Sequence, residues 1–177
     1  MIETKPVGVN GKTVVGVKIE NAHVPEKLAK EKMVEEEKQE APTRMLPHCA
    51  KEAENLNVIL ACDGAANVGQ IGHQVAVELT NTHERARMCC ITAVAAESKV
   101  HVDIARRARK LIIINGCANR CASKVLERLS IPYGYEIVIA EEGVKKVPTL
   151  DYDKADVERI AKKIAKEALG VSESSSP

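Results

Sequence analysis

Cysteine is the residue type whose number and spacing in this chain point most directly to chemistry. Six cysteines occur in 177 residues, and Cys117 and Cys121 stand four positions apart. Thiolates so close together can bind zinc or an iron–sulfur cluster, and they can also act as nucleophiles or sulfur carriers. Because Cys-x₃-Cys is looser than the Cys-x₂-Cys pair of zinc fingers, spacing alone leaves metal binding and thiol chemistry both open.

The aliphatic run at residues 111–114 comes directly before this pair. Four such residues without alternation predict a strand covered on both faces of a sheet. The run ends at Asn115 and Gly116, and a helix is expected from about residue 119 to residue 129. Open α/β sheets place their ligands just past the carboxyl ends of such strands. The two thiols are therefore expected at a ligand-binding edge.

Three further strands and three further helices are predicted around this motif. Strands are expected at 58–61, 86–91 and 135–139, and helices at 67–80 and 98–108 and after Asp153. Asn67 is expected to cap the 67–80 helix, with Gln70 completing a capping box. Alternating strands and helices imply crossover connections and a parallel sheet. The predicted fold class is α/β: a three-layer sandwich with a mainly parallel four-stranded sheet, Rossmann-like or flavodoxin-like, with strand order 2-1-3-4.

In this topology cysteines far apart in the sequence meet at one edge. Cys62 follows the 58–61 strand, Cys89 and Cys90 end the next one, and Cys117 and Cys121 follow the third. Alternation along a strand sends Cys89 and Cys90 to opposite faces, so one of the two joins the site. Four thiolates around one point suit tetrahedral Zn²⁺, and the same set would hold an iron–sulfur cluster.

Thiol-redox or sulfur-carrier chemistry is the alternative use of these cysteines. Cys62 precedes one helix and Cys121 lies in the first turn of another, where the helix dipole stabilises a thiolate. Residues 64–69 could also offer free N–H groups to an anion. His73 falls on the face of its helix away from the apolar stripe and is expected at the surface. Since no general base stands out nearby, enzymatic activity is left undecided.

Composition excludes several function classes. The formal net charge of +1 provides no excess of cations for binding nucleic acid, and three tyrosines with no Phe or Trp provide no base-stacking platform. No signal peptide and no apolar run of membrane-spanning length are found, so a cytoplasmic protein without a membrane partner is expected. Cysteines in that compartment favour metal or thiol chemistry over structural disulfides.

The N-terminal region, residues 1–50, is expected to be an extension. Residues 7–19 predict a β-hairpin around an Asn10-Gly11 turn, and residues 25–41 form a linker rich in Glu and Lys. A protein partner could dock on this extension, and an oligomer is also possible. The cysteine-rich α/β domain is predicted at residues 55–170, followed by a disordered tail at 171–177.

Three segments around the cysteines resemble the DGC-domain family, whose members are regarded as zinc-binding. They are residues 62–70 (Cys-Asp-Gly-Ala-Ala-Asn-Val-Gly-Gln), 90–93 (Cys-Ile-Thr-Ala) and 115–122 (Asn-Gly-Cys-Ala-Asn-Arg-Cys-Ala). The resemblance covers residues 57–168 and implies four zinc ligands: Cys62, Cys90, Cys117 and Cys121. It thereby selects Cys90 over Cys89. The chain departs from the family at Asn115, where the family has Asp, and the resemblance implies no reaction.

Overall fold

The computed structural model of the protein describes residues 6–9, 12–15, 46 and 48–171. The chain divides into two compact units, Met1–Met45 and Leu46–Pro177. In the first unit, strands β1 (Pro6–Val9) and β2 (Lys12–Val15) pair antiparallel. The predicted Asn10-Gly11 turn, the charged linker at 25–41 and residues 172–177 of the tail lie outside the described residues. The hairpin extension as a whole therefore stays a prediction.

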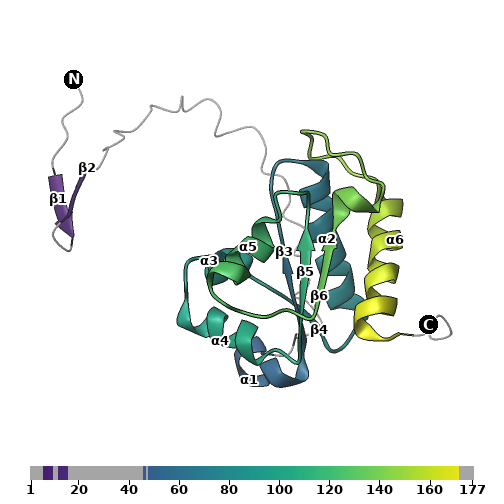
Figure 1. The fold of residues 1–177 in the computed structure, drawn as a ribbon, viewed down its shortest axis with the longest axis horizontal. Coiled ribbons are helices and arrows are strands. Elements are labelled where there is room, and N and C mark those ends of the chain that lie inside the picture. The colour runs from purple at the N-terminus through teal and green to yellow at the C-terminus, as the bar shows by residue number, and fades with distance from the viewer. Residues whose placement is uncertain (1–5, 10–11, 16–45, 47, 172–177) are drawn as a thin grey trace, which may run out of the picture. The chain divides into compact units, whose positions relative to one another are not determined.

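The second unit is built on a four-stranded parallel sheet flanked by helices (Figure 1). Its strands are β3 (Asn57–Ala61), β4 (Ala86–Cys89), β5 (Lys110–Asn115) and β6 (Tyr135–Val138). They lie in the order β4-β3-β5-β6, which is the predicted order 2-1-3-4. All of β3, and β5 from Leu111 onward, is buried, as the unbroken aliphatic runs predict.

Helices cover both faces of the sheet (Figure 1). Helices α2 (Asn67–Thr82) and α6 (Lys154–Ile164) pack on one face, against alternate strand residues such as Ile59 and Ile112. The other face packs Val58, Leu60 and Ile113 against residues of α1 (Cys49–Glu52), α3 (Ile91–Ala95), α4 (Lys99–Arg107) and α5 (Cys121–Arg128). Each large aliphatic side chain so buried stabilises the fold by about 1.5–3 kcal/mol.

Short irregular helices complete the unit. Single turns of 3₁₀ helix occur at Ala53–Asn55 and Ile139–Glu142, and a π-helical turn, Ala165–Leu169, ends the last helix at Gly170. Asp153 caps α6 as predicted, because its side chain accepts a hydrogen bond from the N–H of Ala155 at 2.8 Å. In the described part of the chain, no helix has the length and apolarity needed to cross a bilayer.

Two local predictions differ from the structure. Strand β4 ends at Cys89 rather than at residue 91, because Cys90 is the N-cap of α3 and its Sγ accepts the N–H of Ala93 at 3.4 Å. The predicted Asn67 cap is wrong: Ala66 is the N-cap of α2 and has no capping side chain. Asn67 is the first helical residue, and its side chain instead bonds a loop far along the sequence.

Candidate thiol site at the edge of the sheet

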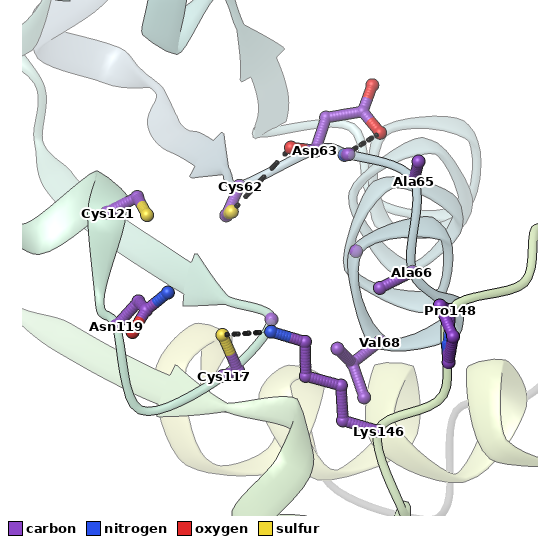
Figure 2. Close-up of a pocket in the computed structure, with 13 residues that line it drawn as sticks. Cys62, Asp63, Ala65, Ala66, Val68, Cys117, Asn119, Cys121, Lys146 and Pro148 are labelled. Atoms are coloured by element: carbon purple, nitrogen blue, oxygen red, sulfur yellow. Dashed lines mark hydrogen bonds between the residues drawn. The ribbon is translucent and has the colours of Figure 1, made fainter.

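Three of the predicted site cysteines line one pocket at the carboxyl edge of the sheet (Figure 2). Cys62 directly follows β3, Cys117 lies two residues past β5, and Cys121 begins α5. The N–H of Cys62 donates to the carbonyl of Ile114 at 2.7 Å, so the pairing of the two central strands continues into the site. The cavity has a volume of about 450 Å³. The parallel topology thus brings together thiols separated by more than fifty residues.

The fourth predicted ligand, Cys90, is not among the residues that line this pocket. It belongs with Cys49 and Cys89, which both pack against the core on the α4 and α5 face. Burial raises the pKa of the Cys89 thiol, and the neighbouring thiols Cys49 and Cys90 raise it further. We call Cys62, Cys117 and Cys121 the pocket thiols, and Cys49, Cys89 and Cys90 the Cys89 group.

The pocket thiols differ in their electrostatics. The backbone N–H of Asn119 and the ammonium of Lys146 hold the pKa of Cys117 below its ordinary value, and Lys146 Nζ donates to Cys117 Sγ at 3.4 Å. Partial burial raises the pKa of Cys62, and the nearby Cys121 and Cys117 add to that rise. Hydrogen bonding from the Gly116 backbone offsets part of it. The site therefore combines one thiol whose deprotonation is favoured, Cys117, with one whose deprotonation is disfavoured, Cys62.

Asn67 holds the loop that carries Lys146. Its side-chain amide donates to the carbonyl of Lys145 at 2.9 Å and accepts the N–H of Val147 at 2.8 Å. Its own N–H donates to the carbonyl of Val147 at 3.2 Å. This three-bond clasp fixes the 145–147 loop against the start of α2, beside the pocket. Asn67 is buried, at 8% exposure, so these bonds have little competition from water.

Two glycines allow the loops of the site to touch backbone to backbone. A Cβ added to Gly116 would lie 3.2 Å from the backbone N of Gly69 and 3.3 Å from the carbonyl of Val68. One added to Gly69 would lie 3.1 Å from both N and O of Gly64. A larger residue at Gly116 would press the Cys117 loop away from α2, and one at Gly69 would press on the Asp63–Gly64 turn after Cys62. Either change would displace the backbone next to a pocket thiol.

Asp63, next to Cys62, is held by short-range contacts. Its Oδ1 accepts the N–H of Gly64 at 2.8 Å and the amide of Gln70 at 3.2 Å, and its Oδ2 lies 3.6 Å from Nδ1 of His73. The His73 side chain is partly exposed, whereas the sequence predicted a surface position, and it contacts the Asp63 carboxylate. The N–H groups of Gly64, Ala66 and Gly69 donate within the protein and are not free for an anion.

The donor set can be compared with what zinc requires. In the part of the chain that the structure describes, no group of three or more His, Cys, Asp or Glu side chains is arranged to hold a metal ion as it stands. The pocket thiols nevertheless supply three sulfur donors of the kind that zinc accepts. Holding an ion would require the three sulfurs to turn toward one point, with Cys117 leaving Lys146.

Sequence reasoning missed two charged residues at the site. Lys146 lies 29 residues from its partner Cys117, and Glu136 lies 21 residues from its partner Asn115. Neither position carries a local signal for its partner, because Lys146 belongs to an ordinary charged segment and Glu136 is a single acidic residue in an otherwise uncharged strand. The predicted strand order, which makes β3 and β5 neighbours, indicated that the segments following these two strands would meet.

Comparison with known proteins places this site in a family. The model of the DGC domain matches residues 58–164, which include the pocket thiols, Asn67 and Lys146. The anaerobic and virulence modulator AnvM of Pseudomonas aeruginosa is 30% identical over 105 residues, which cover 59% of this chain and 79% of AnvM. No solved structure matches the chain. The chain belongs to the DGC-domain family.

Proposed function

We propose that the pocket thiols bind a zinc ion at the carboxyl edge of the sheet. The observation that carries this proposal is that three cysteines from two chain segments, one following β3 and one following β5, line a single pocket. A redox pair would need only two. Thiolates at Cys62, Cys117 and Cys121 would repel one another, and a divalent cation offsets that repulsion. Because Cys62 holds its proton in the metal-free protein, zinc binding would release protons and strengthen as pH rises.

Cys90 is the proposed fourth ligand, by resemblance to the family. Its contact with Ala93 at the start of α3 would have to break for it to join the other three. With Cys90, the site would be a closed tetrathiolate of structural type; without it, one position would stay open, as in catalytic zinc sites. Cobalt substitution separates these cases, because the thiolate charge-transfer absorption grows with the number of sulfur ligands.

The direct test is anaerobic zinc titration of the reduced full chain. The proposal expects one zinc per chain, lost in Cys62→Ser, Cys117→Ser and Cys121→Ser and kept in Cys89→Ser. Equal loss in Cys117→Ser and Cys89→Ser would contradict this ligand assignment. Iron and acid-labile sulfide, measured in the same preparation, would instead identify an iron–sulfur cluster held by the same cysteines.

A second candidate, thiol-redox or sulfur-carrier chemistry, is favoured by one specific contact. Lys146 Nζ lies 3.4 Å from Cys117 Sγ, and the pKa of Cys117 is lowered. A lowered pKa raises the fraction of Cys117 that is thiolate, the form that acts as the nucleophile. Cys62 and Cys121 would then be the resolving thiols. Reduced protein without metal, whose Cys117 reacts first with a disulfide reagent, would favour this candidate.

The wider setting of the domain is also part of the proposal. All six cysteines are free, which suits the reducing cytoplasm. The name of AnvM describes a modulator, and we propose that this chain too has a regulatory role, exerted through a protein partner. We propose that the hairpin extension provides the contact with that partner, and that the sheet is of the Rossmann or flavodoxin type.

A further inference from the structure

A network of polar side chains lies beneath the loop that carries Cys117 and Cys121, and Glu136 of β6 is its centre. Oε1 of Glu136 accepts hydrogen bonds from Asn115 Nδ2 at 2.9 Å and from Ser123 Oγ at 2.7 Å. Its Oε2 lies 3.2 Å from Nη1 of Arg120 and 3.4 Å from the hydroxyl of Tyr133. A single carboxylate thus accepts from four side chains, which lie on β5, on α5 and on the loops before α5 and before β6.

The part of this network formed by Asn115, Ser123 and Glu136 is shielded from water, whereas the Arg120 side chain is 45% exposed. Asn115 is fully buried, Ser123 is 1% exposed, and the Glu136 side chain is 17% exposed. Asn115 Nδ2 also donates to Ser123 Oγ at 2.7 Å, so the two residues and the carboxylate form a closed triangle. Hydrogen bonds to an ionised group in such surroundings are stronger than those between neutral groups in water.

The network reaches the thiol loop at two points. Oδ1 of Asn115 accepts the N–H of Ala122 at 3.1 Å, which fixes the first turn of α5 directly after Cys121. Arg120, which precedes Cys121, has φ of +47°, a left-handed conformation that is unfavourable for a residue with a side chain. The ion pair between Arg120 and Glu136 helps to hold the backbone in that conformation.

We propose that Glu136 is the positioning residue of the thiol site. Through Arg120 and Asn115 its carboxylate fixes the backbone on both sides of Cys121. It thereby sets where the sulfurs of Cys121 and Cys117 lie relative to Cys62. The hydrogen bonds that Glu136 makes in the structure go to the loop and its supports, so it acts on the thiols through that loop. The inference rests on the proposed use of the pocket thiols as one site, by a metal or by thiol chemistry.

Glu136→Gln is the informative variant, and Glu141→Gln is its matched control. The amide introduced at position 136 would keep an oxygen for Asn115 and Ser123, but Arg120 would lose its ionic partner. Glu141 is the other carboxylate near Arg120, at 3.6 Å, but its side chain is 59% exposed, and its loss should matter little. Arg120→Gly is a third variant, since glycine tolerates the left-handed φ while the side chain that pairs with Glu136 and Glu141 is removed.

Two probes read out the thiol geometry in the full chain. The first is affinity for Zn²⁺, measured by competition with a chelator. The second is phenylarsine oxide, which bridges two neighbouring thiols with loss of water, measured in a Cys49→Ser/Cys89→Ser/Cys90→Ser background that leaves only the pocket thiols. We expect Glu136→Gln and Arg120→Gly to weaken both by about 10–100-fold, the usual effect of removing a partner that orients metal ligands. Glu141→Gln should change neither zinc affinity nor phenylarsine oxide binding by more than about twofold, because exposed ion pairs contribute little.

The outcomes separate this inference from the proposed function. If zinc binds and Glu136→Gln matches Glu141→Gln on both probes, Glu136 does not position the thiols. If the parent protein binds no zinc, the zinc proposal fails, and phenylarsine oxide alone decides the role of Glu136. Thermal unfolding of each variant checks the fold. Should Glu136→Gln fail to fold, Arg120→Gly carries the test, and unaltered binding by a folded Arg120→Gly protein would overturn the inference.

Discussion

Cys117 and Cys89 are the same residue type in one small domain, yet their surroundings shift their pKa values in opposite directions. Cys117 lies beside the ammonium of Lys146, and its pKa is lowered. Cys89 is partly buried beside two other thiols, and its pKa is raised. Clustering of cysteines therefore does not by itself make a reactive or metal-binding site. The neighbouring cation and polar network distinguish the loop that carries Cys117 and Cys121 from the end of β4.

The difference follows from the positions of the strands. Cys62 and Cys117 follow β3 and β5, the two central strands, whose ends meet loops from both sides of the sheet. Cys89 ends β4, an edge strand, and packs toward the core. The carboxyl end of β5 gathers long-range contacts from Lys146 and Glu136. Cys62 and Cys89, at the ends of β3 and β4, instead pack against apolar side chains and lie near other thiols.

The largest expected effect is loss of zinc on removing a pocket thiol. Cys117→Ser should weaken zinc affinity by more than about a hundredfold, beyond the 10–100-fold typical for a residue that only orients a ligand. Cys89→Ser should leave zinc affinity within about twofold, because a partly buried thiol of this kind acts as a small apolar side chain. Chelator competition under reducing conditions measures both. Similar zinc affinities in the two variants would contradict the assignment of zinc to the pocket thiols rather than to the Cys89 group.

The polar network beneath the pocket thiols predicts a strong response to Asn115→Asp. The new carboxylate would lie beside Glu136 Oε1, where the Asn115 amide now lies at 2.9 Å, and would lower the free energy of unfolding by about 2–4 kcal/mol at pH 8. The folded state would keep a proton on one of the two acids, so that folded-state pKa would exceed its unfolded value. The penalty should therefore be small near pH 4 and grow as pH rises.

A double variant that exchanges the amide of residue 115 and the carboxylate of residue 136 is the control for this prediction. Asn115→Asp/Glu136→Gln restores one carboxylate and one amide side by side and should recover most of the lost stability. Urea unfolding at the two pH values measures both variants. An Asn115→Asp protein as stable at pH 8 as the parent would show that the two side chains are not coupled.

The clasp at Asn67 predicts a smaller change. Asn67→Ala leaves the carbonyl of Lys145 and the N–H of Val147 without partners and should lower the free energy of unfolding by about 1–3 kcal/mol. It should also free Lys146 to leave Cys117, so the pKa of Cys117 would move back toward that of an ordinary thiol. The exposed Asn119, changed to alanine, is the control and should cost less than about 0.5 kcal/mol. Urea unfolding measures both, and equal losses in the two variants would contradict the role of the clasp.

The smallest effect is expected from Lys146 itself. Iodoacetamide reacts with thiolates, so alkylation of Cys117 should begin at lower pH than alkylation of Cys89. Lys146→Met should slow the reaction of Cys117 at neutral pH by at most about fivefold, the equivalent of an exposed ion pair of about 1 kcal/mol. It should leave Cys89 unchanged. Mass spectrometry of the alkylated peptides across pH resolves each cysteine, and identical profiles for Cys117 and Cys89 would contradict the comparison.

Local patterns were sufficient to predict the sheet and its carboxyl edge. The aliphatic runs before Cys62 and Cys117 identified the two central strands, and the crossover rule then placed these cysteines together. The position of Cys90 was harder to predict, because β4 is short. Whether the residue after Cys89 continues the strand or caps a helix depends on packing rather than on local sequence. Asn67 has the composition of an N-cap, but its partners lie 78 and 80 residues away. Such long-range pairing of polar side chains leaves no local pattern.

Zinc stoichiometry of the reduced full chain, purified without oxygen or chelator, tests the central claim most directly. We predict close to one zinc per chain, with the metal lost when Cys62, Cys117 or Cys121 is changed to serine. Folded, fully reduced protein that takes up no zinc when zinc is supplied would contradict the claim.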